Sequence, residues 1–333
     1  MKKIICHIKE NNEMFSKVFC IFKTLVICIG ISFLTGSMVM AAAQAQTRFA
    51  SPENAVSSLA TVLKGDDLQA LKSIFGSDAD ELISSGDEVA DKYGRERFLQ
   101  LFDEKNQLVK ESGEKALLEI GKDGWLFPIP LIKDKNGWVF DTKSGKEEIL
   151  NRRIGRNELD TIQTLLAIVD AQREFAMKDY NKDGILEYAE KFKSEPGKYN
   201  GLYWESGDLE AQSPLGPLVA KAKEEQYAVK GNQENPQPYH GYFFKMLKKQ
   251  GASAPGGVFD YVVNGKMIGG FAVISYPAQY GNSGVVTFMA SHDGAVYQKD
   301  LGPDTEKIAK KIDIFNPDNT WQKVEFPDNP KQK

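Results

Sequence analysis

Apolar residues recur at helical spacing near the start of the chain and alternate with polar residues further on. Ser51, Pro52 and Glu53 provide a cap residue, a first-turn proline and an acidic neighbour, so a helix is predicted to begin there. Further helices are expected over 67–75 and 87–105, and strands over 116–120, 125–129 and 138–140, with a turn at Asn136-Gly137. Helices followed by such a meander predict an α+β domain over residues 46–150.

The second half repeats this order of helix and then sheet. Residues 146–178 predict two helices broken near Gly155, and the domain boundary is placed around residue 150. An irregular stretch from 194 to 237 contains one short expected helix, 217–225. Strands are expected over 242–247, 259–263, 267–275, 285–290, 295–299 and 321–325, with a terminal helix over 303–314. Residues 151–333 are therefore predicted to form a second α+β domain, in which a long helix leads into an antiparallel sheet.

The order of these elements resembles two known architectures. Residues 46–150 are similar in outline to the cone-shaped NTF2-like proteins. The long helix and second sheet resemble the globular head of type II pseudopilins, although the chain lacks the prepilin cleavage motif.

An uncharged run precedes all of these elements. Residues 24–40 carry no charge, follow Lys17 and Lys23, and are followed by an alanine-rich end at 41–45. This order is typical of a Sec-type signal peptide, with cleavage expected after Ala45 or Ala43. Residues 1–45 are thus predicted to be a signal peptide, and the mature protein is expected in the periplasm or outside the cell, without a stable membrane span. An uncleaved anchor is the alternative, although about 20 apolar residues are usual for a span.

The leader also contains every cysteine of the chain, Cys6, Cys20 and Cys28, so the mature protein is expected to form no disulfide. A start at Met14 instead of Met1 would give a compact basic segment before the apolar run. Without residues 1–45, which hold five lysines and two glutamates, the formal net charge falls from −4 to −7. Such a surface repels phosphate, so nucleic acid is not an expected partner.

One motif carries specific chemistry, the twelve-residue run 179–190, which fits an EF-hand calcium loop at every defining position. Ca²⁺ takes six to eight oxygen ligands, and Gly184 at loop position 6 permits the sharp turn that such a loop needs. The expected ligands are Asp179, Asn181 and Asp183 at positions 1, 3 and 5, the Ile185 carbonyl at position 7, Glu187 at position 9 and Glu190 at position 12. A short exiting helix is expected from 188 to 193, with no second loop to pair with. The expected role is a structural calcium clip, and the alternative is a metal-free Asx-rich turn.

Other site chemistries find less support in the sequence. His240 and His292 are the only histidines after the leader, which argues against a catalytic zinc site with three protein ligands, and no nucleotide-binding motif occurs. His240, Asp260 and Ser283 follow the order of a protease triad, but 43 residues between His240 and Ser283 are too few for two barrels. No catalytic residue is assigned.

Three aromatic residues, Tyr199, Tyr203 and Trp204, follow the calcium-loop motif among glycines. Aromatic side chains beside polar groups can stack on sugars or anchor a protein partner. The alternative is that these rings fold back onto the core and fix an irregular segment.

Several unusual runs identify a family resemblance that spans roughly residues 50–325. They are IGRNELDTIQ, DGILEYAEKF, PGKYNGLYW, GYFFKML, APGG, DYVVNGKMIGGFAV, YPAQYGNSGVVTF and DGAVYQKDLGPDT. The chain resembles the DUF2950 family, exported bacterial proteins of unknown function. The resemblance implies an envelope location and a shared fold, and no known activity.

These patterns together predict an exported envelope protein with a non-enzymatic binding or assembly role and a structural calcium loop. Its partner would be another, unidentified envelope component. The alternative is an enzyme that acts on cell-wall or polysaccharide material through acidic residues, and it would require two carboxylates with raised pKa values in a concave pocket.

Overall fold

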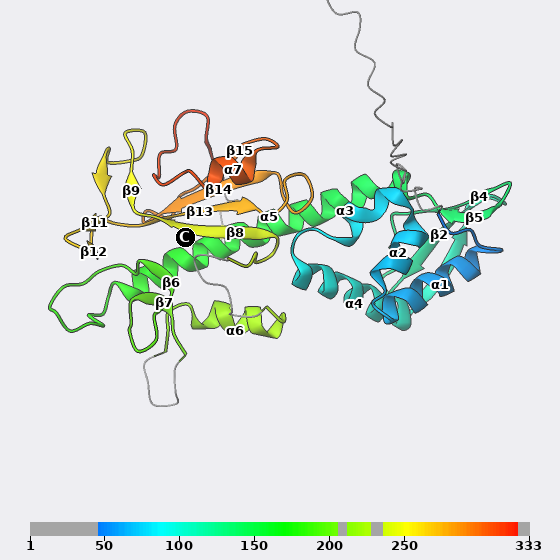
Figure 1. Ribbon diagram of the computed structural model, residues 1–333, viewed down its shortest axis with the longest axis horizontal. Coiled ribbons are helices and arrows are strands. Elements are labelled where there is room, and N and C mark those ends of the chain that lie inside the picture. Colours follow the sequence, from blue (N-terminus) through cyan, green and yellow to red (C-terminus); the bar gives the residue numbers. More distant parts are fainter. Residues whose placement is uncertain (1–45, 206–211, 228–235, 326–333) are drawn as a thin grey trace, which may run out of the picture. The chain divides into compact units, whose positions relative to one another are not determined.

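The computed structural model describes residues 46–205, 212–227 and 236–325 of the chain (Figure 1). The predicted signal peptide, residues 1–45, lies outside these ranges and stays a prediction. Within the described ranges, no helix combines the length and the apolar character needed to cross a bilayer.

The first part of the fold is a group of helices. They are α1 (Pro52–Lys64), α2 (Leu68–Phe75), the 3-10 helix η1 (Ser77–Ala79), α3 (Asp80–Ile83) and α4 (Glu88–Glu104). Of these, α1, α2 and α4 begin at capping side chains. The Ser51 hydroxyl accepts a hydrogen bond from the Asn54 N–H at the start of α1, and Asp87 accepts one from the Ala90 N–H at the start of α4. These bonds satisfy N–H groups that have no partner within a helix. The helix starts expected at Ser51 and near Asp87 are confirmed.

An antiparallel sheet packs against these helices. Its strands are β1 (Asn106–Lys110), β2 (Lys115–Ile120), β3 (Trp125–Leu126), β4 (Leu131–Asp134) and β5 (Gly137–Phe140). The spatial order is β1-β2-β4-β5, and β3 pairs with β2. Alternate residues of β2, Ala116, Leu118 and Ile120, are buried against α1 and α2 in one hydrophobic core. The turn that joins β4 to β5 is Lys135-Asn136, one residue before the expected Asn136-Gly137, because Gly137 already pairs with Asp134 as the first residue of β5.

A single helix, α5 (Thr142–Phe175), follows the first sheet and runs for 34 residues. The predicted break near Gly155 is wrong, because Gly155 lies on an open helix face where no other group interrupts the helix. At its start, α5 lies so close to the preceding loop that a Cβ at Gly145 would be 2.5 Å from the Pro128 carbonyl oxygen. The domain boundary expected near residue 150 falls inside this helix, and the division into two domains stays a prediction.

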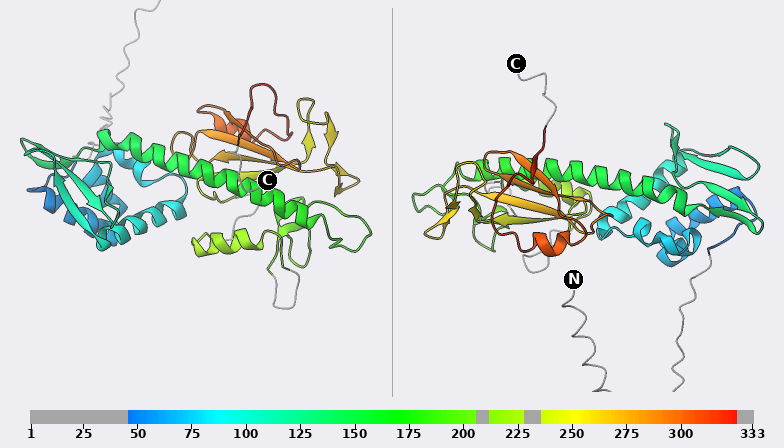
Figure 2. Two further views of the ribbon diagram at one scale, coloured as in Figure 1. Left: turned by 180° about the vertical axis from the view of Figure 1, so that it is seen from behind. Right: turned by 90° about the horizontal axis from the view of Figure 1, so that it is seen from above.

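The second sheet is also antiparallel and consists of β8 (Tyr242–Leu247), β13 (Ala272–Pro277), β14 (Val286–Ser291), β15 (Val296–Asp300) and β16 (Gln322–Lys323), in the order β16-β15-β14-β13-β8. Helices cover both of its faces (Figure 2). Met246 of β8 contacts Gln172 of α5, whereas the neighbouring Lys245 donates a hydrogen bond to the Lys310 carbonyl at the end of α7 (Thr305–Ala309). Successive strand residues point to opposite faces, so α5 and α7 lie on opposite sides of the sheet.

Short elements surround the second sheet. The strand β9 (Lys249–Gln250) pairs with β10 (Phe259–Asp260), β11 (Val262–Val263) pairs with β12 (Lys266–Met267), and β6 (Lys191–Lys193) runs parallel to β7 (Gly201–Tyr203). The helix expected at 217–225 is present as α6 (Gly216–Glu224). The β11–β12 hairpin turns at Asn264 and Gly265, which both have positive φ, as a two-residue type I′ turn requires.

The terminal helix is shorter than expected. It was expected over 303–314, but α7 ends at Ala309. The chain then turns so that Phe315, 1% exposed, enters the core, where its N–H donates to the Lys249 carbonyl and its own carbonyl accepts from the Gly251 N–H. Burial of one aromatic ring therefore outweighs continued helix at this point.

The fold is α+β, as predicted, with helices followed by one antiparallel sheet and then a long helix followed by another. Buried apolar residues form two clusters, one under each sheet. The likeness to NTF2-like proteins and to pseudopilin heads stays a prediction.

Candidate metal site

The loop 179–190 follows α5 and is fixed at both ends by aromatic contacts. The Tyr180 ring stacks on Phe175, the last residue of α5, with ring centroids 4.9 Å apart. The Tyr188 ring lies 5.0 Å from Phe271, at the entrance to β13. The loop therefore connects the long helix to the second sheet.

In the first half of the loop, backbone N–H groups point at the side-chain oxygens of the expected ligands. The Gly184 N–H donates to Asp179 Oδ2 at 2.8 Å, and the Asp183 N–H donates to Asn181 Oδ1 at 3.2 Å. The Ile185 N–H donates to Asp183 Oδ1 at 3.0 Å. Gly184 has φ +87°, which a residue without a Cβ adopts readily. The loop thus turns around the side chains at positions 1, 3 and 5.

The second half of the loop brings Glu187 to the same place. Asn181 Nδ2 donates to Glu187 Oε1 at 2.8 Å, which joins positions 3 and 9. Burial raises the pKa of Glu187, the Lys266 ammonium opposes this shift, and the nearby carboxylates Asp183, Glu190 and Asp179 add to it. The carboxylates that raise the pKa of Glu187 are close enough to repel its charge, and a cation between them would relieve that repulsion.

Two lysines from the second half of the chain neutralise part of this charge. The Lys266 ammonium is hydrogen-bonded to Asp183 Oδ2 and lies 3.9 Å from Glu187 Oε1. This hydrogen bond is the main cause of the lowered pKa of Asp183. Lys248 Nζ donates to Glu190 Oε2 at 2.6 Å. Sequence patterns within the loop gave no sign of either lysine.

Four of the six expected ligands lie together in one network of hydrogen bonds and ion pairs. Asp179, Asn181, Asp183 and Glu187 supply oxygen atoms, and an ammonium group already lies between two of them. Across the residues that the structure describes, no three histidine, cysteine or acidic side chains are close enough to hold a metal ion as they stand. Calcium binding would therefore require Glu190 to leave Lys248 and close the loop.

The element after the loop differs from the expectation. Instead of a helix over 188–193, the Tyr188 N–H donates to the Met267 carbonyl at 2.8 Å, and β6 begins at Lys191. The side-chain amide of Gln172, fully buried on α5, makes two hydrogen bonds of 2.8 Å with the backbone of Ala189. These bonds hold the chain extended where an EF-hand would start its second helix.

The three aromatic residues expected to form a surface are placed differently from one another. Tyr203 and Trp204 are each 7% exposed and belong to the core under the second sheet. These two rings therefore fold back onto the core, which was the alternative to a binding surface. Tyr199 is 39% exposed and lies edge-on to Trp204, with ring centroids 4.9 Å apart. Only Tyr199 of these three presents much of its ring to solvent.

The residues in protease order do not form a nucleophilic site. The Ser283 hydroxyl is fully buried and donates to the Gln279 carbonyl of its own turn, and Asp260 is exposed on β10. His240 has φ +49° in a two-residue turn before β8, and its ring nitrogens lie 3.2 Å from Glu225 and 3.8 Å from Asp160.

A buried polar cluster at this turn was not foreseen from the sequence. One oxygen of Asp87 accepts hydrogen bonds from the Gly241 N–H at 2.8 Å and from the Tyr227 hydroxyl at 2.9 Å. Burial raises the pKa of Tyr227, and the Asp87 charge adds to the shift, so this phenol stays protonated and donates. The only local signal in the sequence was the position of Asp87 before α4.

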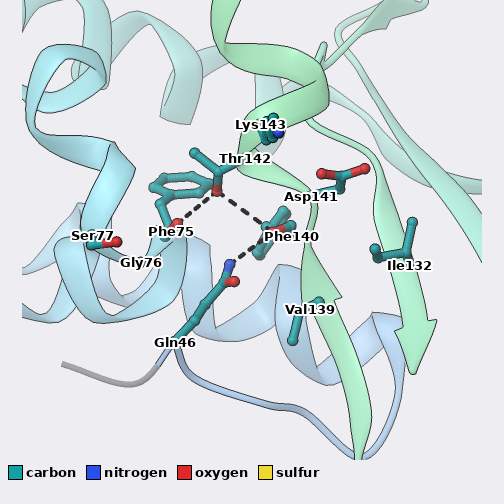
Figure 3. A pocket seen from close by; sticks show the side chains of 10 residues that line it. All are labelled: Gln46, Phe75, Gly76, Ser77, Ile132, Val139, Phe140, Asp141, Thr142 and Lys143. Atoms are coloured by element: carbon teal, nitrogen blue, oxygen red, sulfur yellow. Dashed lines mark hydrogen bonds between the residues drawn. The ribbon is translucent and has the colours of Figure 1, made fainter. Parts of the chain in front are cut away.

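A shallow pocket of about 230 Å³ lies where α5 begins (Figure 3). Gln46 Nε2 reaches into it and donates to the Phe140 carbonyl at 2.7 Å and to the Ile74 carbonyl at 3.0 Å. Its one carboxylate, Asp141, caps α5 by accepting from the Ser144 N–H. A second pocket, of about 320 Å³, also has one carboxylate, Glu147. Neither pocket holds the pair of acids that glycoside hydrolysis uses.

The described part of the chain is an α+β protein in which a long helix connects two five-stranded antiparallel sheets, and the loop with the EF-hand-like sequence follows this helix. The chain belongs to the family described as "Protein of unknown function (DUF2950)", whose match covers residues 46–324. Comparison with curated proteins and with solved structures found no match.

Proposed function

We propose that this chain is an exported envelope protein with a non-enzymatic binding or assembly role, and that loop 179–190 binds Ca²⁺ as a structural clip. The observation that carries the calcium proposal is the group of oxygen donors around a cation: the Lys266 ammonium lies between Asp183 and Glu187. Calcium bound there would join the end of α5 to the second sheet. The metal's contribution would be to stabilise this connection.

The calcium proposal is tested by thermal unfolding of metal-free mature protein with and without calcium. A site of extracellular type, with Kd about 10⁻⁴–10⁻³ M, would gain about 1.4–2.7 kcal/mol at about 10 mM Ca²⁺. For a protein of this size, that corresponds to a rise in melting temperature of about 2–5 °C.

Glu190→Gln removes the closing ligand and is expected to abolish most of the rise in melting temperature. Glu195→Gln is the matched control, because it makes the same substitution five residues later, outside the loop, where Glu195 pairs with Lys198. Identical melting curves of the wild-type protein with calcium and with chelator would refute the metal site.

Export is proposed from the uncharged run at 24–40 and its alanine-rich end, and the family match begins where this leader is expected to end. Gln46 directly follows the expected cleavage position, and its side chain makes two hydrogen bonds with the folded chain. Mass analysis of protein from the envelope fraction is expected to find an N-terminus at Gln46 or Gln44. An intact leader on protein in the cytosol would exclude this location.

The proposed partner is another envelope component. A pull-down from envelope extract with and without chelator addresses partner and metal together. Capture of the same protein with and without chelator would show that partner binding does not depend on calcium. The alternative enzyme acting on polysaccharide is the weaker proposal, since each of the two pockets contains a single carboxylate.

A further inference from the structure

Lys266 reaches the loop because of a sharply defined hairpin. It is the first residue of β12, immediately after the Asn264-Gly265 turn, and its neighbour Met267 accepts a hydrogen bond from the Tyr188 N–H inside the loop. A two-residue turn fixes the register of a hairpin, so the backbone at Lys266 has little freedom to move away. The Lys266 side chain is 24% exposed, which places its ammonium between protein groups.

The ammonium occupies the region that a bound calcium ion would need. It is bonded to Asp183, at loop position 5, and is 3.9 Å from Glu187, at loop position 9. Calcium bonds to oxygen at about 2.3–2.6 Å, so both carboxylates would have to turn from the ammonium to the metal. Two cations that share the same carboxylates also repel each other.

We propose that Lys266 is a tethered competitor of calcium, which keeps the loop folded without metal and lowers the affinity of the loop for Ca²⁺. This inference rests on the proposed calcium site and names the residue that regulates it. Metal binding expels the ammonium from between Asp183 and Glu187. The contacts of the Lys266 side chain, which belongs to the β11–β12 hairpin, therefore depend on whether calcium is bound to the loop.

Calcium titration of the full mature protein by calorimetry tests the competition. Lys266→Met removes the charge and keeps the length of the side chain, and calcium is expected to bind about tenfold more tightly, the effect of removing one positive charge a few ångströms from a divalent ion. Lys266→Arg keeps the charge and is expected to stay near wild type. Lys310→Met is the matched control, since Lys310 pairs with Glu306 of α7.

The outcomes separate the competitor from the site. Tighter binding by Lys266→Met alone supports the proposal. Equal affinity of Lys266→Met and the wild-type protein refutes the competitor and leaves the calcium site standing. An absence of calcium binding in both proteins refutes the site, and the competitor with it.

A second measurement uses only the wild-type protein and so does not depend on how a variant folds. An amine-reactive reagent followed by peptide mass analysis reports the accessibility of each lysine. Lys266 is expected to react several times faster with calcium than with chelator, because the metal displaces its ammonium, while Lys310 reacts at one rate. Unchanged reactivity of Lys266 at saturating calcium would overturn the proposal.

Discussion

Asp87 is the buried charge whose removal tests the fold most directly. Its carboxylate is 1% exposed and caps α4 by accepting from the Ala90 N–H at 3.0 Å. The other oxygen accepts from the Gly241 N–H and the Tyr227 hydroxyl. A single side chain therefore satisfies donors from three segments that are far apart in the sequence.

The cost of Asp87→Ala follows from these three hydrogen bonds. Loss of an N-cap costs about 1 kcal/mol. Each buried donor left without an acceptor costs about 1–3 kcal/mol more, and the Gly241 backbone is buried away from water. We expect the free energy of unfolding to fall by about 3–5 kcal/mol, with some compensation by relaxation around the new alanine.

Urea unfolding followed by tryptophan fluorescence measures this loss. Asp67→Ala is the matched control, because Asp67 also caps a helix, accepting from the Gln69 and Ala70 N–H groups, but is exposed. It should cost about 1 kcal/mol. Tyr227→Phe, which leaves Asp87 in place but removes one of its donors and the acceptor of the His240 N–H, should cost about 1–2 kcal/mol. Equal losses for Asp87→Ala and Asp67→Ala would refute the role given to the buried bonds.

Two further predictions concern α5 and the segment after the loop. Gly145→Ala should destabilise the protein by at least about 2 kcal/mol, because its Cβ would overlap the backbone of a neighbouring loop. Gly155→Ala, in open space on the same helix, should stabilise the protein by about 0.5–1 kcal/mol. Urea unfolding of both variants measures these changes, and similar effects of the two substitutions would contradict the prediction. Hydrogen bonds from Lys191 and Lys198 lower the pKa of Glu195 to about 2, so its contribution to stability is present above the unfolded-state pKa of about 4.3 and is lost as the pH falls from there through the folded-state value. An NMR titration of this carboxyl should show the low midpoint and its return towards 4.5 in a Lys191→Met, Lys198→Met variant, and a wild-type midpoint near 4 would contradict the ion pairs.

Local chemistry was sufficient where an element is decided by its own residues. Ser51 caps α1 as expected, and a turn lies within one residue of the expected Asn136-Gly137, at Lys135-Asn136. Each depends on contacts within a few positions of the chain, which a sequence displays directly. Most strand segments of the two large sheets show such local patterns, whereas the single helix α5 was expected as two helices.

Distant contacts decided the elements that were predicted wrongly. The glycine at 155 weakens a helix by about 1 kcal/mol, too little to break α5 when its buried face packs on the second sheet. The extended chain after the loop depends on Gln172, 17 positions before Ala189. No local pattern marks a glutamine that bonds to a backbone so far along the chain.

The candidate site also combines local contacts, which a sequence displays, with distant contacts, which it does not. The candidate oxygen ligands are spaced regularly within twelve residues, so the sequence alone suggests them. Lys266, however, is 83 positions from Asp183 and reaches the loop from a hairpin. A loop pattern therefore predicts which atoms could bind a cation, whereas the fold decides which cation competes for them. If calcium binds, its free energy is the difference between its attraction to the carboxylates and the cost of expelling an ammonium tethered beside them. A loop with ideal ligands can consequently bind calcium weakly, and the sequence of the loop alone cannot reveal its affinity.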